Sequence, residues 1–161
     1  MEFHPLSRVW IYQSDSVFNK AQVQELEQLL ADFTADWQAH QQQLKAGYEI
    51  RYNRFLVLIV DESQAGASGC SIDKSVHLMK EIQEKYQVNL FDRFNIAYKE
   101  QEEVKALSRE GFESLIAEGQ VNQNTIVFNN LVQSYQEYQE KWECKFLDSW
   151  HNRVFSLPQG I

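Results

Sequence analysis

The chain has 161 residues, of which 43% are hydrophobic and 13% aromatic, and its 15 basic and 23 acidic side chains give a formal net charge of -8. A chain of this length and composition can bury one sizeable core, so we expect a single globular domain over residues 1–161. The negative charge repels nucleic-acid phosphates and anionic lipids, and no cluster of Lys or Arg offsets it. We therefore expect neither nucleic acid nor a membrane surface as a partner.

Targeting and redox signals predict a cytoplasmic protein. Residues 1–13 contain no basic stretch followed by an apolar one, so no signal peptide is predicted. The longest apolar run, residues 55–60, is too short to span a bilayer. The two cysteines, Cys70 and Cys144, do not make a disulfide framework, and we expect both to be free thiols.

The first elements are a strand and a long helix. Residues 8–13, RVWIYQ, are β-branched and aromatic and predict a strand. Asn19 is a candidate N-cap with Gln22 reaching back to it, and Gly47 fits the end of the helix. The apolar seam of this helix consists of Val23, Leu26, Leu30, Phe33, Trp37, His40 and Leu44. Such a seam is more typical of a core helix than of a homodimer face, and on it His40 is expected to be a hydrogen-bonded edge residue rather than a ligand.

The middle of the chain predicts a covered strand followed by a second helix. Residues 48–61 form one long strand or two short ones that meet near Asn53. Because residues 55–60 are apolar on both faces, we place them centrally in the sheet. The second helix is expected to begin near Ser71, and its buried stripe consists of Ile72, Val76, Met79, Ile82 and Tyr86.

The last third continues the alternation of strands and helices. Strands are predicted at 93–98 and 124–128, and a helix at 101–118 with Gly119 as its stop. A final helical stripe comprises Leu131, Tyr135, Tyr138 and Trp142, and the aromatic tail 145–155 is expected to pack back on the body. The pattern favours an α/β or α+β fold, a two- or three-layer sandwich with a mixed sheet of four to five strands and about four helices.

Residues 56–62, LVLIVDE, match the acidic strand of nucleotide-hydrolysing proteins, in which the first acid helps to hold Mg²⁺. A phosphate-binding loop needs glycines, because its backbone must approach the phosphates closely. In the order found in ABC-type ATPases that loop precedes the acidic strand, yet the first glycine of this chain is Gly47. No such loop can therefore exist upstream.

A loop downstream of the acidic strand also fails as a phosphate-binding loop. Lys74 and Ser75 provide the right ending, but Ser68 and Asp73 occupy the positions of the two required glycines. A carboxylate at the second of these positions would face the phosphates. ATP hydrolysis of the ABC type is therefore not expected.

Several segments together resemble a family of small uncharacterised bacterial proteins, mostly from Bacteroidetes. They are RVWIYQSD, FLVLIVDE, ASGCSIDKSV, LFDR, VFNNLV and SWHNR, and they cover nearly the whole chain. Members of that family are often labelled "ABC transporter ATPase", a label that we attribute to the acidic strand. The resemblance implies no established activity and no catalytic residues.

The segment 61–75 is the first candidate site. Ser71 is a candidate N-cap with Asp73 in the first helical turn, and free N–H groups there could bind a small anion together with Lys74 and Ser75. The interpretation that we favour is that Ser71 and Asp73 satisfy the helix end themselves.

Candidate catalytic groups are few. Cys70 beside a helix N-terminus could act as a thiolate, although a small buried filler is the commoner role of such a cysteine. Asp61 and His151 are the other candidates for acid–base chemistry. Four acids could converge on a metal, but no ligand spacing supports this, so we expect no metal and no cofactor. They are Asp61, Glu62, Asp73 and Asp92.

The tail offers a second candidate surface. Trp150, His151 and Arg153 lie close to Asp148 and could form a recognition surface of the kind found at interface hot spots. They could equally anchor the tail, with His151 and Arg153 paired to acids. Both interpretations stay open.

Because no complete catalytic motif is present, the sequence favours a non-hydrolytic cytoplasmic binding or interaction protein. Its partner would be a small anion or another protein, and its site would lie at residues 61–75. The alternative is an enzyme of unrecognised type that uses Cys70, Asp61 or His151. A homodimer or adaptor that works through the apolar seam or the aromatic tail is the third hypothesis.

Overall fold

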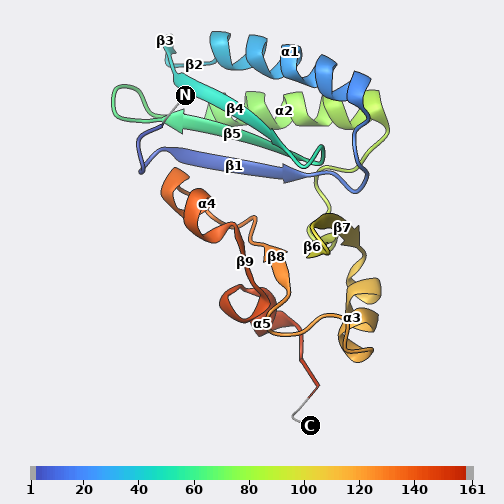
Figure 1. Cartoon of the computed structure of the whole chain (residues 1–161). Helices are drawn as coiled ribbons and strands as arrows, with labels where there is room; N and C mark the ends of the chain where they lie inside the picture. The colour runs from blue at the N-terminus through green and yellow to red at the C-terminus, as the bar shows by residue number, and fades with distance from the viewer. Residues whose placement is uncertain (1–2, 159–161) are drawn as a thin grey trace.

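A computed structural model describes residues 3–158 (Figure 1). Its strands are β1 (Arg8–Gln13), β2 (Gln38–Ala39), β3 (Gln42–Gln43), β4 (Lys45–Arg51), β5 (Phe55–Asp61), β6 (Ile96–Glu100), β7 (Glu103–Leu107), β8 (Ile126–Phe128) and β9 (Glu143–Lys145). Its helices are α1 (Lys20–Asp36), α2 (Gly69–Tyr86), α3 (Arg109–Ala117), α4 (Tyr135–Lys141) and α5 (His151–Val154), with a 3₁₀ turn η1 (Phe146–Asp148). The α+β class is confirmed, and the strands are divided among three antiparallel sheets in place of one mixed sheet.

The first sheet is built around β5. Its strand order is β1-β5-β4, and all seven residues of β5 are buried: the six apolar residues 55–60, as predicted, and Asp61. The predicted break near Asn53 is the three-residue turn between β4 and β5, in which Tyr52 and Asn53 have φ angles of 53° and 52°. This sheet therefore has a covered centre and two edges, β1 and β4.

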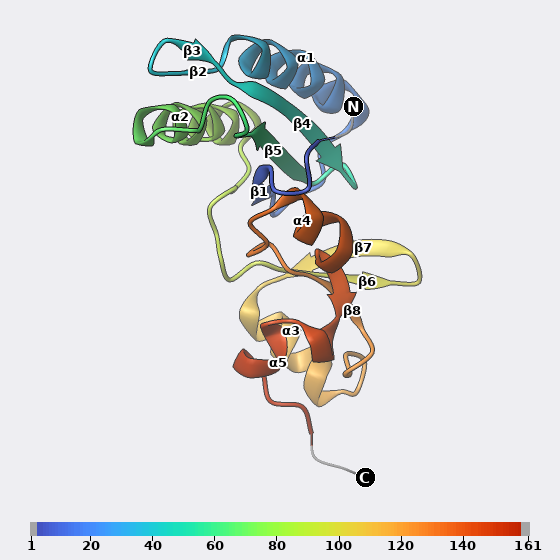
Figure 2. The same ribbon diagram turned by 90° about the vertical axis from the view of Figure 1, so that its left-hand side faces the viewer.

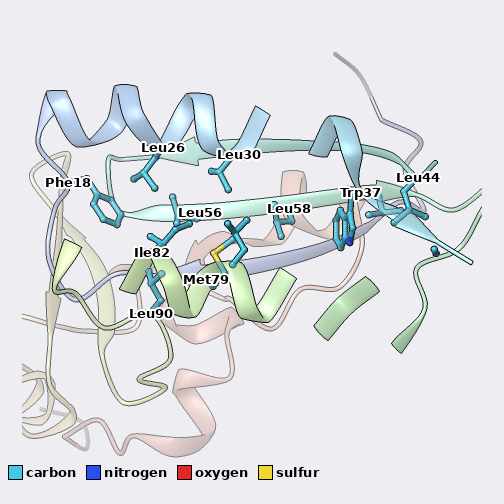
Figure 3. Packing of buried hydrophobic residues seen from close by; sticks show 13 residues of the cluster. Phe18, Leu26, Leu30, Trp37, Leu44, Leu56, Leu58, Met79, Ile82 and Leu90 are labelled. Carbon is cyan, nitrogen blue, oxygen red and sulfur yellow. The ribbon is translucent and has the colours of Figure 1, made fainter. Parts of the chain in front are cut away.

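Helices α1 and α2 cover one face of this sheet (Figures 1 and 3). The predicted capping box of α1 is confirmed, because Asn19 and Gln22 hydrogen-bond reciprocally. The core between the helices and the sheet consists of Phe18, Leu26, Leu30, Trp37, Ala39, Leu44, Leu56, Leu58, Val60, Leu78, Met79, Ile82 and Leu90. The apolar seam of α1 is thus buried within the chain.

The prediction that the first helix runs to residue 44 is wrong. It ends at Asp36, and a small hairpin of β2 and β3 follows, whose turn places His40 at a φ of 50°. Trp37 and Leu44 flank this hairpin and are both buried in the core under α1. Their positions in the sequence therefore match the spacing of a helix although neither residue is helical. His40 is an exposed turn residue, not a seam residue.

Gly47 does not end a helix either. It lies in β4 opposite Ile59, and a Cβ atom added at this position would come within 2.4 Å of the Phe3 ring. The glycine therefore lets the N-terminal segment pack across the strand.

The other face of the first sheet packs against α4 and the four-stranded sheet, whose order is β7-β6-β8-β9 (Figure 2). The shared core consists of Phe3, Val9, Phe55, Val57, Ile59, Ala97, Phe128, Val132, Tyr135, Tyr138 and Trp142. Side chains of both sheets thus share one hydrophobic cluster. The prediction of a single domain is not tested by this packing and stays a prediction.

The predicted helix at 101–118 is only half correct. Gln101 and Glu102 form a hairpin turn with φ angles of 51° and 69°, so the next five residues return as β7. Ser108 then caps α3, and Gly119 follows its end at a φ of 78°, as expected of a helix stop. In the sequence, Ser108 alone separates β7 from α3.

The aromatic tail packs back on the body, as predicted. It begins at the last residue of β9 and forms η1 and α5, and its Phe146 and Phe155 are buried against Phe112 of α3. The tail thereby brings α5 into the four-stranded half of the molecule, on the far side of α4 from the first sheet (Figures 1 and 2).

Candidate functional site

The acidic end of β5 is occupied by local contacts. The Asp61 carboxylate is buried, accepts a hydrogen bond from the Ser63 N–H at 3.0 Å and lies 3.4 Å from Lys45 Nζ. Hydrogen bonds from Ser63, followed by the Lys45 ammonium, lower the pKa of Asp61. Glu62 accepts from the backbone N–H of Ala67 at 2.8 Å. Both acids thus shape the loop that follows the strand.

The start of α2 is closed by its own residues. The N-cap is Ser68, three residues before the Ser71 that the sequence suggests, and the two form a capping box. Ser71 is buried, and its carbonyl accepts a hydrogen bond from the Trp37 indole at 2.9 Å. The interpretation that Ser71 and Asp73 satisfy the helix end is therefore corrected: Ser68 and Ser71 form the cap, and Asp73 is exposed.

The other candidates of this segment point to no shared site. Cys70, Asp73 and Lys74 are exposed on α2, whereas Ser75 is buried and its hydroxyl donates to the Ile72 carbonyl at 2.6 Å. Across residues 3–158, no group of three or more His, Cys, Asp or Glu side chains could hold a metal ion. The segment 61–75 therefore offers one exposed thiol and one exposed ammonium on the surface of a capped helix.

A cleft beside β1 is the strongest candidate site. It has a volume of about 490 Å³ and lies where the end of β1, the loop before β6, the segment after β8 and the start of α5 meet. Its lining consists of Ile11, Tyr12, Gln13, Leu90, Phe91, Asp92, Arg93, Asn95, Ile96, Ala97, Phe128, Asn130, Leu131, Trp150 and His151. The segments that meet here are far apart in the sequence.

An amide network fixes three walls of the cleft. The Gln13 side chain donates to the backbone and side-chain oxygens of Asn95 at 2.7 and 2.9 Å. Asn130 donates to the Gln13 side-chain oxygen at 2.8 Å and accepts from the Trp142 indole at 2.9 Å. These four hydrogen bonds link Gln13 to both loops, so the network holds β1 against them in a defined position.

Trp150 and His151 form the fourth wall. Their rings are stacked with centroids 3.8 Å apart, and the Nδ1 atom of buried His151 lies 2.7 Å from the Ser149 hydroxyl. Burial lowers the pKa of His151 to about 4, so its ring is neutral near pH 7. A group with so low a pKa is a weak general base.

The indole N–H of Trp150 is a buried donor with no hydrogen-bond partner in the part of the chain that the structure describes. Trp150 also lines a second cavity of about 470 Å³, to which Asp148 and the exposed Arg153 contribute. Buried donors are normally paired, so this unpaired N–H calls for a partner that residues 3–158 do not supply. Trp150 therefore combines a place in the cavity lining with a hydrogen-bond donor that lacks a partner among residues 3–158.

The structure brings together only part of the predicted site. Trp150 and His151 line the same cleft, whereas Cys70 and Asp61 are not in its lining. Gln13, Asn95 and Asn130 were not anticipated, because a polar residue at the end of a strand or in a loop is ordinarily solvated. The one sequence feature that could have indicated the cleft is Gln13, a polar residue at the end of a largely apolar and aromatic strand.

Comparisons with protein-family models, with curated proteins and with solved structures find no match to this chain. No helix within residues 3–158 is long and apolar enough to cross a membrane. A function must therefore be inferred from the chemistry of the residues themselves.

Proposed function

We propose that the protein is a non-hydrolytic binding protein whose site is the cleft beside β1. Two observations carry this proposal: Trp150 lines a cavity of about 490 Å³, and its buried indole N–H has no hydrogen-bond partner among residues 3–158. An unpaired buried donor costs roughly 1–3 kcal/mol, which a ligand with a hydrogen-bond acceptor would recover. Cavities of this size suit small ligands or a short stretch of chain.

The ligand that fits this cleft is mostly apolar. Ile11, Ile96 and Phe128 line its interior, and the rim carries Phe91 and Leu131, which are 39% and 68% exposed. Apolar area left open to water beside a cavity is typical of a binding surface. We infer a ligand that has an apolar body and at least one carbonyl or comparable acceptor for Trp150.

Two features favour binding over catalysis. His151 is the only one of the three catalytic candidates in the cleft lining, and its lowered pKa of about 4 makes it a weak base. Asp61 lies at the far end of β5 and Cys70 at the start of α2. This separation supports a binding role over an enzyme that uses all three groups.

We also propose that the protein acts in the cytoplasm and belongs to the Bacteroidetes family that its motifs resemble. Both of its cysteines, Cys70 and Cys144, are unpaired, which suits a reducing compartment. The seam of α1 is buried within one chain, which favours a ligand or a different protein over a second copy as partner.

A thermal-shift screen of metabolites, nucleotides and metal ions tests the proposed site. A ligand of the native state raises the melting temperature, and we expect the shift to shrink in Trp150→Phe and to persist in Cys70→Ala. Ligands whose shifts are equal in both variants would place the site elsewhere. Turnover of a nucleotide or ester that Cys70→Ala or Asp61→Ala abolishes would overturn the non-hydrolytic role.

A further inference from the structure

Strand β1 lies at the edge of its sheet and presents backbone groups to the cleft. In an antiparallel pair, alternate residues bond to the partner strand and those between them face outward. Ser14 donates to the Arg54 carbonyl in continuation of the ladder with β5, whereas Val9 donates outward to the Gln133 carbonyl at 3.0 Å. By this alternation, the N–H and C=O groups of Ile11 face outward too.

The chain itself already pairs with the first half of this edge. Arg8 and Ser134 form an antiparallel bridge, and the Tyr135 N–H donates to the Ser7 carbonyl at 2.8 Å. Beyond Val9 this segment leaves the strand, and Ile11 lies in the lining of the cleft. Its backbone N–H and C=O have no hydrogen-bond partner among residues 3–158.

We propose that the occupant of the cleft is an extended peptide segment of another protein, which adds as a strand to β1 beyond Val9. This inference rests on the proposed binding function and specifies its ligand. A peptide strand supplies a carbonyl and an N–H in alternation, which are the partners that Ile11 lacks, and its side chains alternate between two faces. A further peptide carbonyl would accept from the Trp150 indole.

The chemistry of the peptide follows from the same surroundings. The free part of the edge, Ile11–Gln13, spans about three residues or roughly 10 Å, so the paired region is short. Apolar side chains suit the interior and the exposed rim residues Phe91 and Leu131. Because the chain carries a net charge of -8, basic residues that flank the paired segment are favoured.

The probe is a random octapeptide library displayed on phage and selected against the purified full-length protein. Selected peptides are synthesised, and their binding is followed by Trp fluorescence and by backbone amide exchange in NMR. We expect exchange of the Ile11 amide to slow on binding, while that of Tyr12, already paired with β5, stays unchanged. N-methylation of the peptide should lower affinity by about tenfold at every second position only.

A matched pair of variants tests the role of Ile11. Proline is tolerated on an edge strand where the N–H faces away from the sheet, so Ile11→Pro removes the donor and keeps the ladder with β5. We expect it to weaken peptide binding by about tenfold, and Ile11→Val to bind as the wild type does. The N-methyl series uses the unaltered protein and therefore holds even if Ile11→Pro fails to fold.

Each outcome separates this inference from the proposed function. Peptides that bind with no periodic effect of N-methylation and no protection of Ile11 would overturn strand addition. If no peptide is selected, but a small molecule raises the melting temperature of the wild type and not of Trp150→Phe, the cleft remains the binding site. The proposal of a peptide ligand is then overturned. If neither binds, both proposals fail.

Discussion

The hydroxyl of Tyr52 donates a hydrogen bond of 2.6 Å to the carboxylate of Glu143 and so joins the β4–β5 turn to β9 of the other sheet. The ammonium of Lys99 also contacts Glu143, and Arg51 Nη2 lies 3.5 Å from it. Burial alone would raise the pKa of Glu143, but the hydrogen bonds from Lys99 and Tyr52 outweigh it and lower the pKa. The carboxylate is therefore charged and holds the two halves of the molecule together.

Removal of this carboxylate should destabilise the chain more than removal of the hydroxyl. We expect Tyr52→Phe to cost about 1 kcal/mol and Glu143→Gln about 2 kcal/mol, because the latter also leaves Lys99 without its anion. Because the folded pKa of Glu143 is lowered, its contribution is present above the unfolded value of 4.5 and lost as pH falls below it. Urea unfolding near neutral pH and near pH 3 checks both effects, and a Glu143→Gln penalty that persists in acid would contradict them.

The contact between Phe3 and Gly47 predicts a second pair of variants. A methyl group at residue 47 would overlap the Phe3 ring, so we expect Gly47→Ala to cost about 1–3 kcal/mol. Phe3→Leu should also destabilise the chain, by loss of core packing. The double variant should then be less unstable than the sum of the two, because the smaller side chain leaves room for the methyl group. Strict additivity in urea unfolding would show that the two residues do not touch.

The elements that the sequence predicts well are those whose signal is local. The apolar run of β5 and the capping box at Asn19 each depend on residues within a few positions of one another, and both are confirmed. The predicted first helix is too long because Trp37 and Leu44, which flank the hairpin of β2 and β3, keep a helical spacing. Spacing alone cannot distinguish a longer helix from a helix followed by a hairpin, since Trp37 and Leu44 are buried in the same core.

The cleft could not be predicted because its polar residues become important only through tertiary pairing. Gln13, Asn95 and Asn130 lie far apart in the sequence and resemble ordinary strand-end and turn residues. Trp150 and His151 were identified from their chemistry, yet their cleft is formed with β1 rather than with the segment 61–75. Residue type thus indicated part of the site, and the topology decided its location.

The two thiols should differ in reactivity. Cys70 is exposed on the first turn of α2, whereas Cys144 is half-buried and burial raises its pKa. Since the thiolate is the reactive form, we expect an aromatic disulfide reagent near neutral pH to modify Cys70 quickly and Cys144 slowly. Cys70→Ser should remove the fast phase alone, and in denaturant both thiols should react alike. A fast phase that survives in Cys70→Ser would contradict the burial of Cys144.

Burial of His151 makes the stability of the chain depend on pH. Its pKa falls from 6.5 in the unfolded chain to about 4 in the folded chain, so the unfolded chain binds more protons between these values. Stability therefore rises with pH across this window, and it is lost as pH falls from 6.5 toward 4. The full shift corresponds to about 3 kcal/mol, of which about 2 kcal/mol is lost by about pH 5.

Replacement of His151 by Asn isolates this effect, because an amide does not titrate in this range. We expect His151→Asn to be less stable than the wild type near neutral pH, since the stack on Trp150 is lost, but to change little between about pH 7.5 and about pH 5. Urea unfolding of the wild type and His151→Asn at both pH values measures the difference. Equal pH dependence in the wild type and His151→Asn would mean that His151 can take up a proton in the folded chain, which would also restore it as a candidate general base in the cleft.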